Sequence, residues 1–166
     1  MDSIELKPIG VIHTPFKEPK GTPIQPGRSD GARGTVEVYQ QYEMGLKDLD
    51  GFSHITLLYH FHLSTGFKLM VTPYLDDRER GLFATRAPRR PNPIGLSVVK
   101  LEKIEGNILH VTNVDMIDGT PLLDIKPYVR EFDAAEDFRI GWLEDKVNRK
   151  DRKVADERFH KREDDK

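Results

Sequence analysis

The sequence predicts a mainly β fold: a single small β-barrel with one long peripheral helix near the C-terminal end. Three observations support this prediction. Many short segments are rich in β-branched residues, Gly and Pro recur between them, and few segments have helical periodicity. Short strands joined by such turns are typical of closed or nearly closed barrels rather than of layered α/β sheets. The 166 residues are enough for one domain with one core.

The first half of the chain alternates predicted strands with one long loop. Residues 6–13 predict a strand, and residues 17–33 are dense in Pro and Gly. Loops of this length inside a compact domain are usually functional or mobile. Residues 34–39 resume a strand with period-two alternation, and residues 42–49 predict a short helix.

The second half of the chain carries the strongest strand signals. Residues 55–62 are the most apolar stretch and predict a central strand. Glu105-Gly106-Asn107 lies between two apolar segments, a pattern typical of a hairpin. The other predicted strands cover residues 67–74, 81–85, 96–104, 108–114 and 122–128.

The last segment predicts the one long helix, over residues 140–160. Asp145 with Arg149, and Glu157 with Lys161, have the spacing of favourable ion pairs. The apolar stripe is thin, which predicts a peripheral position. We therefore divide the chain into a barrel domain, residues 1–138, and a charged C-terminal helix or tail, residues 139–166.

Composition excludes several classes of protein. The chain has no cysteine, which excludes disulfides, thiolate metal sites and cysteine nucleophiles. No apolar run approaches the roughly 20 residues needed to cross a bilayer. The acidic start lacks the basic residues and apolar core of a signal peptide. These features predict a cytoplasmic protein that does not enter a membrane.

The charges give no overall argument for nucleic-acid binding, because the formal net charge is only −2. Binding to RNA would need a local basic surface. An arginine cluster exists in one short stretch: Arg78, Arg80, Arg86, Arg89 and Arg90. Taken alone, such a cluster is more often a solvated loop than a phosphate-binding patch.

Familiar catalytic motifs are absent from the sequence. It contains neither the glycine fingerprint of dinucleotide-binding folds nor a P-loop, and Ser97 does not lie in a nucleophile elbow. His60 and His62 point to one face of a predicted strand and could supply two metal ligands. A third ligand would have to come from His13, His54 or His110, and no motif singles one out. We therefore predict no metal site.

Three segments carry stronger signals for a binding site. Residues 85–97 hold three prolines and three arginines between two predicted strands, so this loop is stiff. Residues 118–128 place two carboxylates, an ammonium and a phenol on a turn and the extended segment after it. Residues 22–28 form the centre of the early Pro/Gly loop. A stiff loop that exposes arginines suits an anion- or adenine-binding wall, although it is also compatible with a rigid crossover.

These segments resemble the signatures of the TrmO (TsaA-like) family. The chain from Arg86 to Ser97 is similar to the motif R-x-x-x-R-P-N-P-I-G-[ML]-S, and the chain from Asp118 to Tyr128 is similar to D-G-T-P-x-x-D-I-K-P-Y. The opening strand ending at Phe16 and the loop from Pro23 to Gly27 also resemble the family. The matches occur in the family's order and extend from about Leu6 to Tyr128.

The resemblance implies a small β-barrel that pairs into a homodimer. It also implies an S-adenosylmethionine-dependent methyltransferase, which acts on N6 of threonylcarbamoyladenosine at position 37 of threonine tRNA. The positions that carry over to the methyl-donor site are Pro23, Ile24, Gln25, His62, Leu63, Arg86, Leu96, Asp118, Gly119, Thr120 and Pro121. The family often has Arg in place of Ile24 and Gln in place of Leu63.

The chemistry of methyl transfer fits these residue types. In-line displacement at a sulfonium needs no metal, and positioning supplies much of the rate. Within the resemblance, Arg86 would hold a carboxylate or phosphate, Leu96 would bracket the adenine, and the turn at 118–121 would offer backbone groups.

A general base is expected as well, because the acceptor nitrogen is part of a urea and is a poor nucleophile. The candidates are Asp124 and Tyr128, with Lys126 polarising the carbonyl. An equally good interpretation of the three is a structural cluster of hydrogen bonds and ion pairs.

Two kinds of alternative remain open from sequence. One is methylation of another nucleotide or of a small molecule. The other is a non-enzymatic β-barrel that binds metal or RNA. Metal analysis and donor titration discriminate between them.

Overall fold

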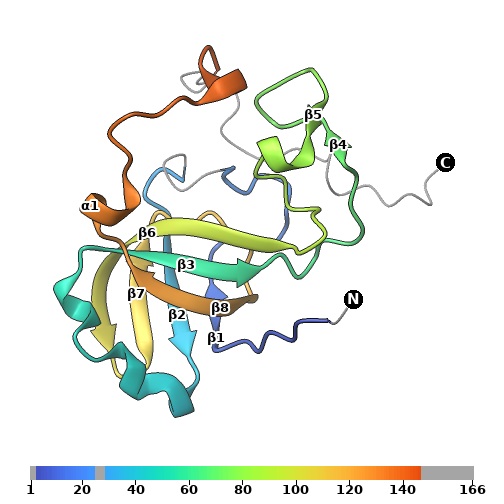
Figure 1. The fold of residues 1–166 in the computed structure, drawn as a ribbon. Coiled ribbons are helices and arrows are strands. Elements are labelled where there is room, and N and C mark those ends of the chain that lie inside the picture. The colour runs from blue at the N-terminus through green and yellow to red at the C-terminus, as the bar shows by residue number, and fades with distance from the viewer. Residues whose placement is uncertain (1–2, 25–28, 147–166) are drawn as a thin grey trace.

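The computed structural model describes residues 3–24 and 29–146, and its centre is a closed six-stranded antiparallel barrel. The strand order around the barrel is β1-β2-β7-β6-β3-β8 (Figure 1). The strands are β1 (Gly10–His13), β2 (Arg33–Val38), β3 (His54–His60), β6 (Ile94–Glu105), β7 (Ile108–Thr112) and β8 (Thr120–Pro127). The predicted mainly β barrel is confirmed.

Period-two alternation explains why these segments close into a barrel. Along β3, Ile55, Leu57 and Tyr59 are buried, while the residues between them are partly exposed. Since successive side chains of a strand point to opposite faces, each strand presents one apolar row to the interior. The core also contains Ile12, Val36, Val38, Leu49, Val99, Leu101, Leu109, Val111, Val114, Met116 and Leu122.

β6 and β7 form the predicted hairpin, with Gly106 in its turn at φ +59°. Glycine adopts such a φ without a steric penalty, which is why the Glu105-Gly106-Asn107 sequence predicts the turn. β3 lies between β6 and β8, and its register with β8 shifts at Leu58 and Tyr59. This irregularity lies where β3 approaches the cavity described below.

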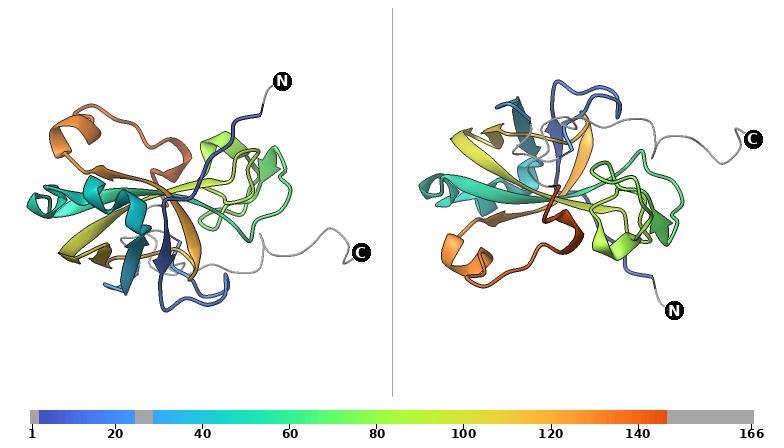
Figure 2. Two further views of the ribbon diagram at one scale, coloured as in Figure 1. Left: turned by 90° about the horizontal axis from the view of Figure 1, so that it is seen from below. Right: turned by 90° about the horizontal axis from the view of Figure 1, so that it is seen from above.

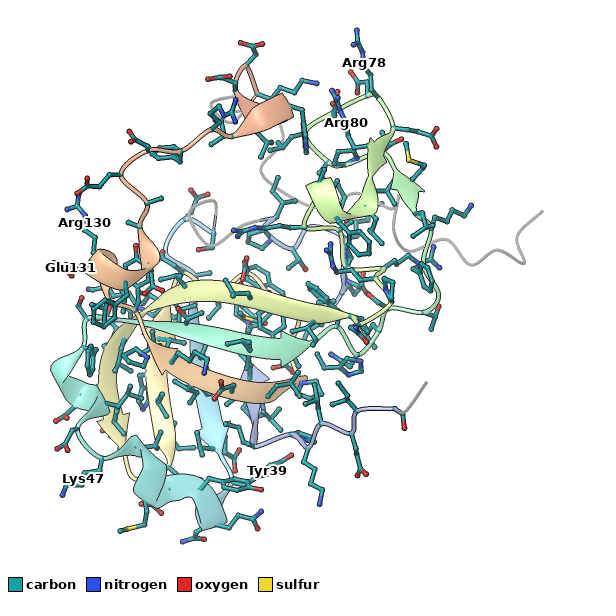
Figure 3. The ribbon with its side chains drawn as sticks, in the orientation of Figure 1. Tyr39, Lys47, Arg78, Arg80, Arg130 and Glu131 are labelled. Atoms are coloured by element: carbon teal, nitrogen blue, oxygen red, sulfur yellow. The ribbon has the colours of Figure 1, made fainter. Side chains whose placement is uncertain are left out.

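A small second layer lies beyond one end of the barrel. It consists of the two-stranded ribbon β4 (Met70–Val71) and β5 (Arg80–Gly81) and the 3-10 helix η4 (Leu82–Ala84). Figure 2 shows this layer on the side opposite the teal helices η2 (Gln40–Leu46) and η3 (Leu49–Gly51). In Figure 3, Arg78 and Arg80 mark this layer, and Lys47 marks the opposite end.

Several predicted elements differ from the structure. The expected strand at 67–74 is reduced to Met70–Val71, because its apolar side chains Phe67, Leu69 and Met70 are mostly exposed and form no buried face. The expected strand at 81–85 is mostly a 3-10 helix: the strand β5 ends at Gly81, and η4 covers Leu82–Ala84. The short helix predicted at 42–49 is also of the 3-10 type and covers Gln40–Leu46.

The predicted long helix at 140–160 falls mainly outside the described residues. Its described beginning is the short 3-10 helix η5 (Gly141–Leu143), and Gly141 has a φ of +58°, which is not helical. The chain reaches η5 after α1 (Arg130–Asp133), crossing from the barrel back to the β4–β5 layer (Figure 1). Across residues 3–24 and 29–146, no helix is long and apolar enough to span a membrane.

The crossing segment is attached to the β4–β5 layer by Trp142. Its indole Nε1 donates a hydrogen bond of 2.8 Å to the carbonyl oxygen of Ala84. The Arg80 guanidinium lies 5.4 Å from the centre of the indole ring and forms an ion pair of 2.8 Å with Asp76. Lys146 also pairs with Asp76, and together these two cations hold the pKa of that carboxyl well below its usual range. The end of the described chain is therefore attached to the β4–β5 layer and the loop between its strands.

Candidate binding cavity

A cavity of about 350 Å³ opens where the ends of β3 and β6 meet the early loop and the β4–β5 layer. Five parts of the chain supply its walls: residues 19–24, the end of β3 with residues 61–64, Tyr74, the arginine-rich loop with the start of β6, and residues 115–120. Most ligand cavities have mainly apolar walls and a few convergent polar groups. This cavity fits that description, with Ile24, Phe61 and Leu96 beside Arg86 and Asp115.

Three polar side chains in this region form one hydrogen-bonded chain. The Ser97 hydroxyl donates to Asp115 Oδ1 over 2.7 Å, and the Tyr59 hydroxyl lies 3.0 Å from Ser97 Oγ. Because Ser97 has one hydroxyl proton and gives it to Asp115, Tyr59 must donate to Ser97. The carboxylate of Asp115 is thus held at the end of a chain that begins on β3.

Burial changes the pKa values of the two ionisable members of this chain. It raises the pKa of the Asp115 carboxyl to about 7, against the opposing effects of the Ser97 hydrogen bond and the Arg86 charge. It also raises the pKa of Tyr59 well above its usual range, and the nearby charge of Asp115 adds to this. Tyr59 therefore stays protonated, while Asp115 titrates near neutral pH. Among the described residues that line the cavity, Asp115 is the only acid.

Gly95 allows the Tyr59 ring to lie against β6. A Cβ atom at residue 95 would lie 2.2 Å from Tyr59 Cε2 and 2.5 Å from Tyr59 Cζ. Phe61 packs against that ring, edge to face, with 5.4 Å between the ring centres. The absence of a side chain at residue 95 is therefore a condition for the Tyr59–Ser97 contact.

The arginine-rich loop uses several of its guanidinium groups internally. Arg90 Nη1 donates to the carbonyl oxygens of Thr85 and Ala87 over 2.9 and 3.3 Å. Arg89 Nε donates to the carbonyl oxygen of Thr65 over 3.0 Å. These bonds brace a loop in which three prolines remove backbone donors. Arg86 and Arg90 also line the cavity. The arginine cluster therefore both stabilises the loop and places positive charge in the cavity wall.

Seven of the eleven predicted donor-site residues line this one cavity: Pro23, Ile24, His62, Leu63, Arg86, Leu96 and Thr120. Gln25 lies outside the described residues. His62 is partly buried, and burial lowers its pKa, so the ring is mostly neutral at pH 7. Of the described residues, no three His, Asp or Glu side chains come together as metal ligands.

Asp118, Gly119 and Pro121 lie outside the cavity wall, and their contacts are structural. Asp118 Oδ1 accepts a hydrogen bond of 3.0 Å from the amide of Thr14, and Oδ2 accepts one of 2.6 Å from Lys17. The amides of Asp118 and Gly119 donate to the carbonyl oxygens of Phe16 and Ile12. The turn therefore ties β8 to the chain around β1, and its two amides are already used.

The predicted acid–base residues also lie away from the cavity wall. Asp124 and Lys126 form an ion pair of 2.8 Å on β8, with side chains 45% and 63% exposed. Asp124 raises the pKa of Lys126, and the Tyr128 ring packs edge-on against His54. Their catalytic role stays a prediction, and the cavity geometry adds no support to it.

Sequence reasoning overlooked Tyr59, Ser97 and Asp115. Asp115 lies between Val114 and Met116, which are both buried. A carboxylate between two buried apolar neighbours is a signal that could have identified it, because such a group is costly unless it is hydrogen-bonded. Its partners come from β3 and β6, distant parts of the chain that meet only in the folded barrel.

The chain matches known proteins over most of its length. Residues 11–134 match the tRNA-methyltransferase O N-terminal domain. A probable S-adenosyl-L-methionine-binding protein of Pyrococcus abyssi is 56% identical over 153 residues, covering 92% of this chain and 83% of that protein. The human tRNA (adenine(37)-N6)-methyltransferase is 39% identical over 138 residues, which are 78% of this chain and 31% of that protein.

Solved structures show the same fold. The crystal structure of TrmO from Pseudomonas aeruginosa superposes with a TM-score of 0.72 at 40% sequence identity. The superposition covers 86% of this chain and 62% of that chain. The chain therefore spans less than two thirds of this solved relative and about a third of the human one.

Proposed function

Because the chain belongs to the family of tRNA-methyltransferase O N-terminal domains, we propose that it is an S-adenosylmethionine-dependent tRNA methyltransferase. The proposed acceptor is N6 of adenosine 37, in its threonylcarbamoylated form in threonine tRNA. The observation that carries the proposal is the cavity, which is lined by Asp115 and by seven of the eleven positions that the resemblance assigns to the donor site. One relative is named for S-adenosylmethionine binding, which supports the proposed donor, and another for adenine-37 methylation, which supports the proposed acceptor.

The residues of the cavity suit a donor of this chemistry. S-adenosylmethionine supplies a methyl group on a positively charged sulfur, with an adenine and an amino-acid end. Ile24, Leu63 and Leu96 offer apolar surface for the adenine, and Arg86 offers a guanidinium for a carboxylate. The rigid loop before β6 fixes the positions of Arg86 and Leu96, so the protein's share of the rate is largely positioning.

Replacing Arg86 by alanine is expected to weaken S-adenosylmethionine binding about 10- to 100-fold, since a hydrogen bond to a charged group contributes about 1.5–3 kcal/mol. Isothermal titration without RNA measures this directly. Arg78→Ala is the matched control, because Arg78 is exposed on the same layer and does not line the cavity (Figure 3). Equal affinities of the two variants would contradict the assignment of Arg86.

The acceptor is tested by nucleoside mass spectrometry of tRNA incubated with protein and donor. We expect N6-methylated threonylcarbamoyladenosine in threonine tRNA, and none in tRNA that lacks the threonylcarbamoyl group. Methylation of a different nucleoside would support another methyltransferase activity in its place. Donor binding without any methylated nucleoside would contradict the proposed reaction.

A homodimer is part of the proposal. The resemblance supports it, and so do large exposed apolar side chains outside the cavity lining, among them Leu69, Met70 and Phe83 at the β4–β5 layer, which are 61%, 51% and 74% exposed. Two-fold dimers are the commonest closed assemblies. Light scattering at micromolar concentration is expected to give the mass of two chains, and an active monomer would exclude the dimer.

A further inference from the structure

The cavity contains an acid that the expected donor contacts do not use. Asp115 lines the wall beside Arg86, Leu96 and Thr120, three of the positions assigned to the donor. Its carboxylate is fixed by the Ser97 hydroxyl at 2.7 Å, and Ser97 is itself fixed by Tyr59 at 3.0 Å. Ser97 and Tyr59 are only 2% and 4% exposed, so the support is rigid.

We propose that Asp115 is the general base of methyl transfer, with Ser97 and Tyr59 as its positioning residues. This inference rests on the proposed function and deepens it. Asp124 on β8, one of the two bases expected from sequence, is half-exposed, paired with Lys126 and outside the cavity wall, and Tyr128, the other, does not line the cavity either. Asp115 is the only carboxylate among the described residues that line the cavity, where donor and acceptor would have to meet.

The proposed step balances in atoms and charge. The acceptor N–H proton passes to the Asp115 carboxylate, and the nitrogen forms a bond to the methyl carbon. The carbon–sulfur bond breaks and leaves its electron pair on sulfur, so the sulfonium becomes a neutral thioether. Asp115 then holds the proton as a neutral carboxylic acid until it returns it to solvent.

The surroundings of Asp115 suit this task. A base is most effective when its pKa lies near the working pH, and burial raises the pKa of Asp115 to about 7. The ionisable groups near it are Tyr59 on β3, Arg86 before β6, and the other cavity residues His62, Tyr74 and Arg90. Arg86 and the Ser97 hydrogen bond both favour the carboxylate, so they keep the base usable at neutral pH.

The main test compares Asp115→Asn with the wild-type protein in donor titration and single-turnover methylation of threonylcarbamoylated threonine tRNA. Asn keeps the shape and can still accept the Ser97 hydrogen bond, but it cannot take a proton. We expect affinities for S-adenosylmethionine and its thioether product within about 3-fold of wild type, with turnover reduced about 10²- to 10⁴-fold. Asp124→Asn is measured in parallel as the rival base.

The second test uses the pH profile of the single-turnover rate. The wild-type rate is expected to rise through a limb with its midpoint near pH 7, as Asp115 loses its proton. Removing the Ser97 hydrogen bond raises the pKa of Asp115, so Ser97→Ala should move this limb to higher pH. His62→Asn should leave the midpoint in place whatever it does to the rate, because the pKa of His62 is lowered, not raised. A purely structural Ser97 would change the rate and leave the midpoint unchanged.

The outcomes separate this inference from the proposed function. A wild-type rate matched by Asp115→Asn, or a loss of turnover in Asp124→Asn alone, would overturn the inference and leave the function standing. Selective loss of S-adenosylmethionine affinity in Asp115→Asn, with product affinity unchanged, would assign the carboxylate to the sulfonium and overturn it too. If the wild-type protein methylates no tRNA, both proposals fail together.

Discussion

Gly95→Ala is expected to lower the free energy of unfolding by about 1–3 kcal/mol or more and to abolish donor binding. The new Cβ would lie 2.2 Å from Tyr59 Cε2 and 2.9 Å from Phe61 Cζ, distances that no relaxed structure tolerates. The Tyr59 ring cannot easily retreat, because it is 4% exposed and packs against Phe61. Moving it breaks the chain that holds Asp115 through Ser97. Denaturant unfolding and donor titration measure the two effects.

Gly45→Ala is the matched control for this substitution. Gly45 lies in η2 at the far end of the barrel, has an ordinary φ, and has nothing within 4 Å of an added Cβ. The free energy of unfolding of the Gly45→Ala variant should therefore be unchanged or slightly higher than that of the wild-type protein. If Gly95→Ala behaved like Gly45→Ala, the close packing of Tyr59 on β6 would be refuted.

The second large effect is a gain in stability from Asp115→Asn that depends on pH. The pKa of Asp115 is about 7 in the folded protein and 3.8 ordinarily, so between these values the folded state binds more protons than the unfolded chain. Stability from this group is therefore fully present below about pH 4 and is lost as the pH rises through 7. Asn does not titrate and escapes that loss. The variant should match wild type near pH 4 and exceed it at pH 8 by at most about 4 kcal/mol.

Asp118→Asn provides a control of opposite sign. Lys17, followed by the Thr14 amide, lowers the pKa of Asp118, so this carboxylate stabilises the fold at neutral pH and loses that effect in acid. Because its folded pKa lies below the ordinary 3.8, Asp118 is still charged at pH 4. Its substitution should therefore cost stability at both pH 4 and pH 8, and little only in stronger acid. Denaturant midpoints at pH 4 and pH 8 distinguish the two carboxylates. If Asp115→Asn lowered the free energy of unfolding equally at both pH values, the pKa of Asp115 would not be raised by folding.

The barrel could be predicted from sequence because its strands obey local rules. In β3 every second residue is buried, and Gly106 marks the β6–β7 turn by a backbone conformation that favours glycine. The β4–β5 layer breaks the first of these rules. Phe67, Leu69 and Met70 have the spacing of strand residues, yet each side chain is more than half exposed. Apolar character alone therefore did not predict which residues are buried there.

Some residues of the cavity could likewise be predicted from sequence, and others could not. Arg86 and Leu96 could be placed because they lie in a continuous and distinctive motif. Asp115 could not, because its properties arise from contact with Ser97 and from burial beside Tyr59, which only barrel closure provides. Asp118 and Asp124 are also predicted from sequence as site residues. In the structure neither lines the cavity, and their carboxylates pair with Lys17 and Lys126. Sequence identifies ionisable groups, but their partners depend on tertiary structure.

The pairing of β1 with β8 has a consequence for how the chain folds during synthesis. β1 is made before the other strands of the barrel, yet one of its two neighbours is β8, the last of the six barrel strands in chain order. The amide of Thr14 bonds to Asp118, 104 residues later. At about 5–20 residues per second, a ribosome would need about 5–20 s to make that stretch. Until then β1 has only β2 beside it, so the nascent barrel stays open along one seam, where chaperones or other chains have access to its apolar lining.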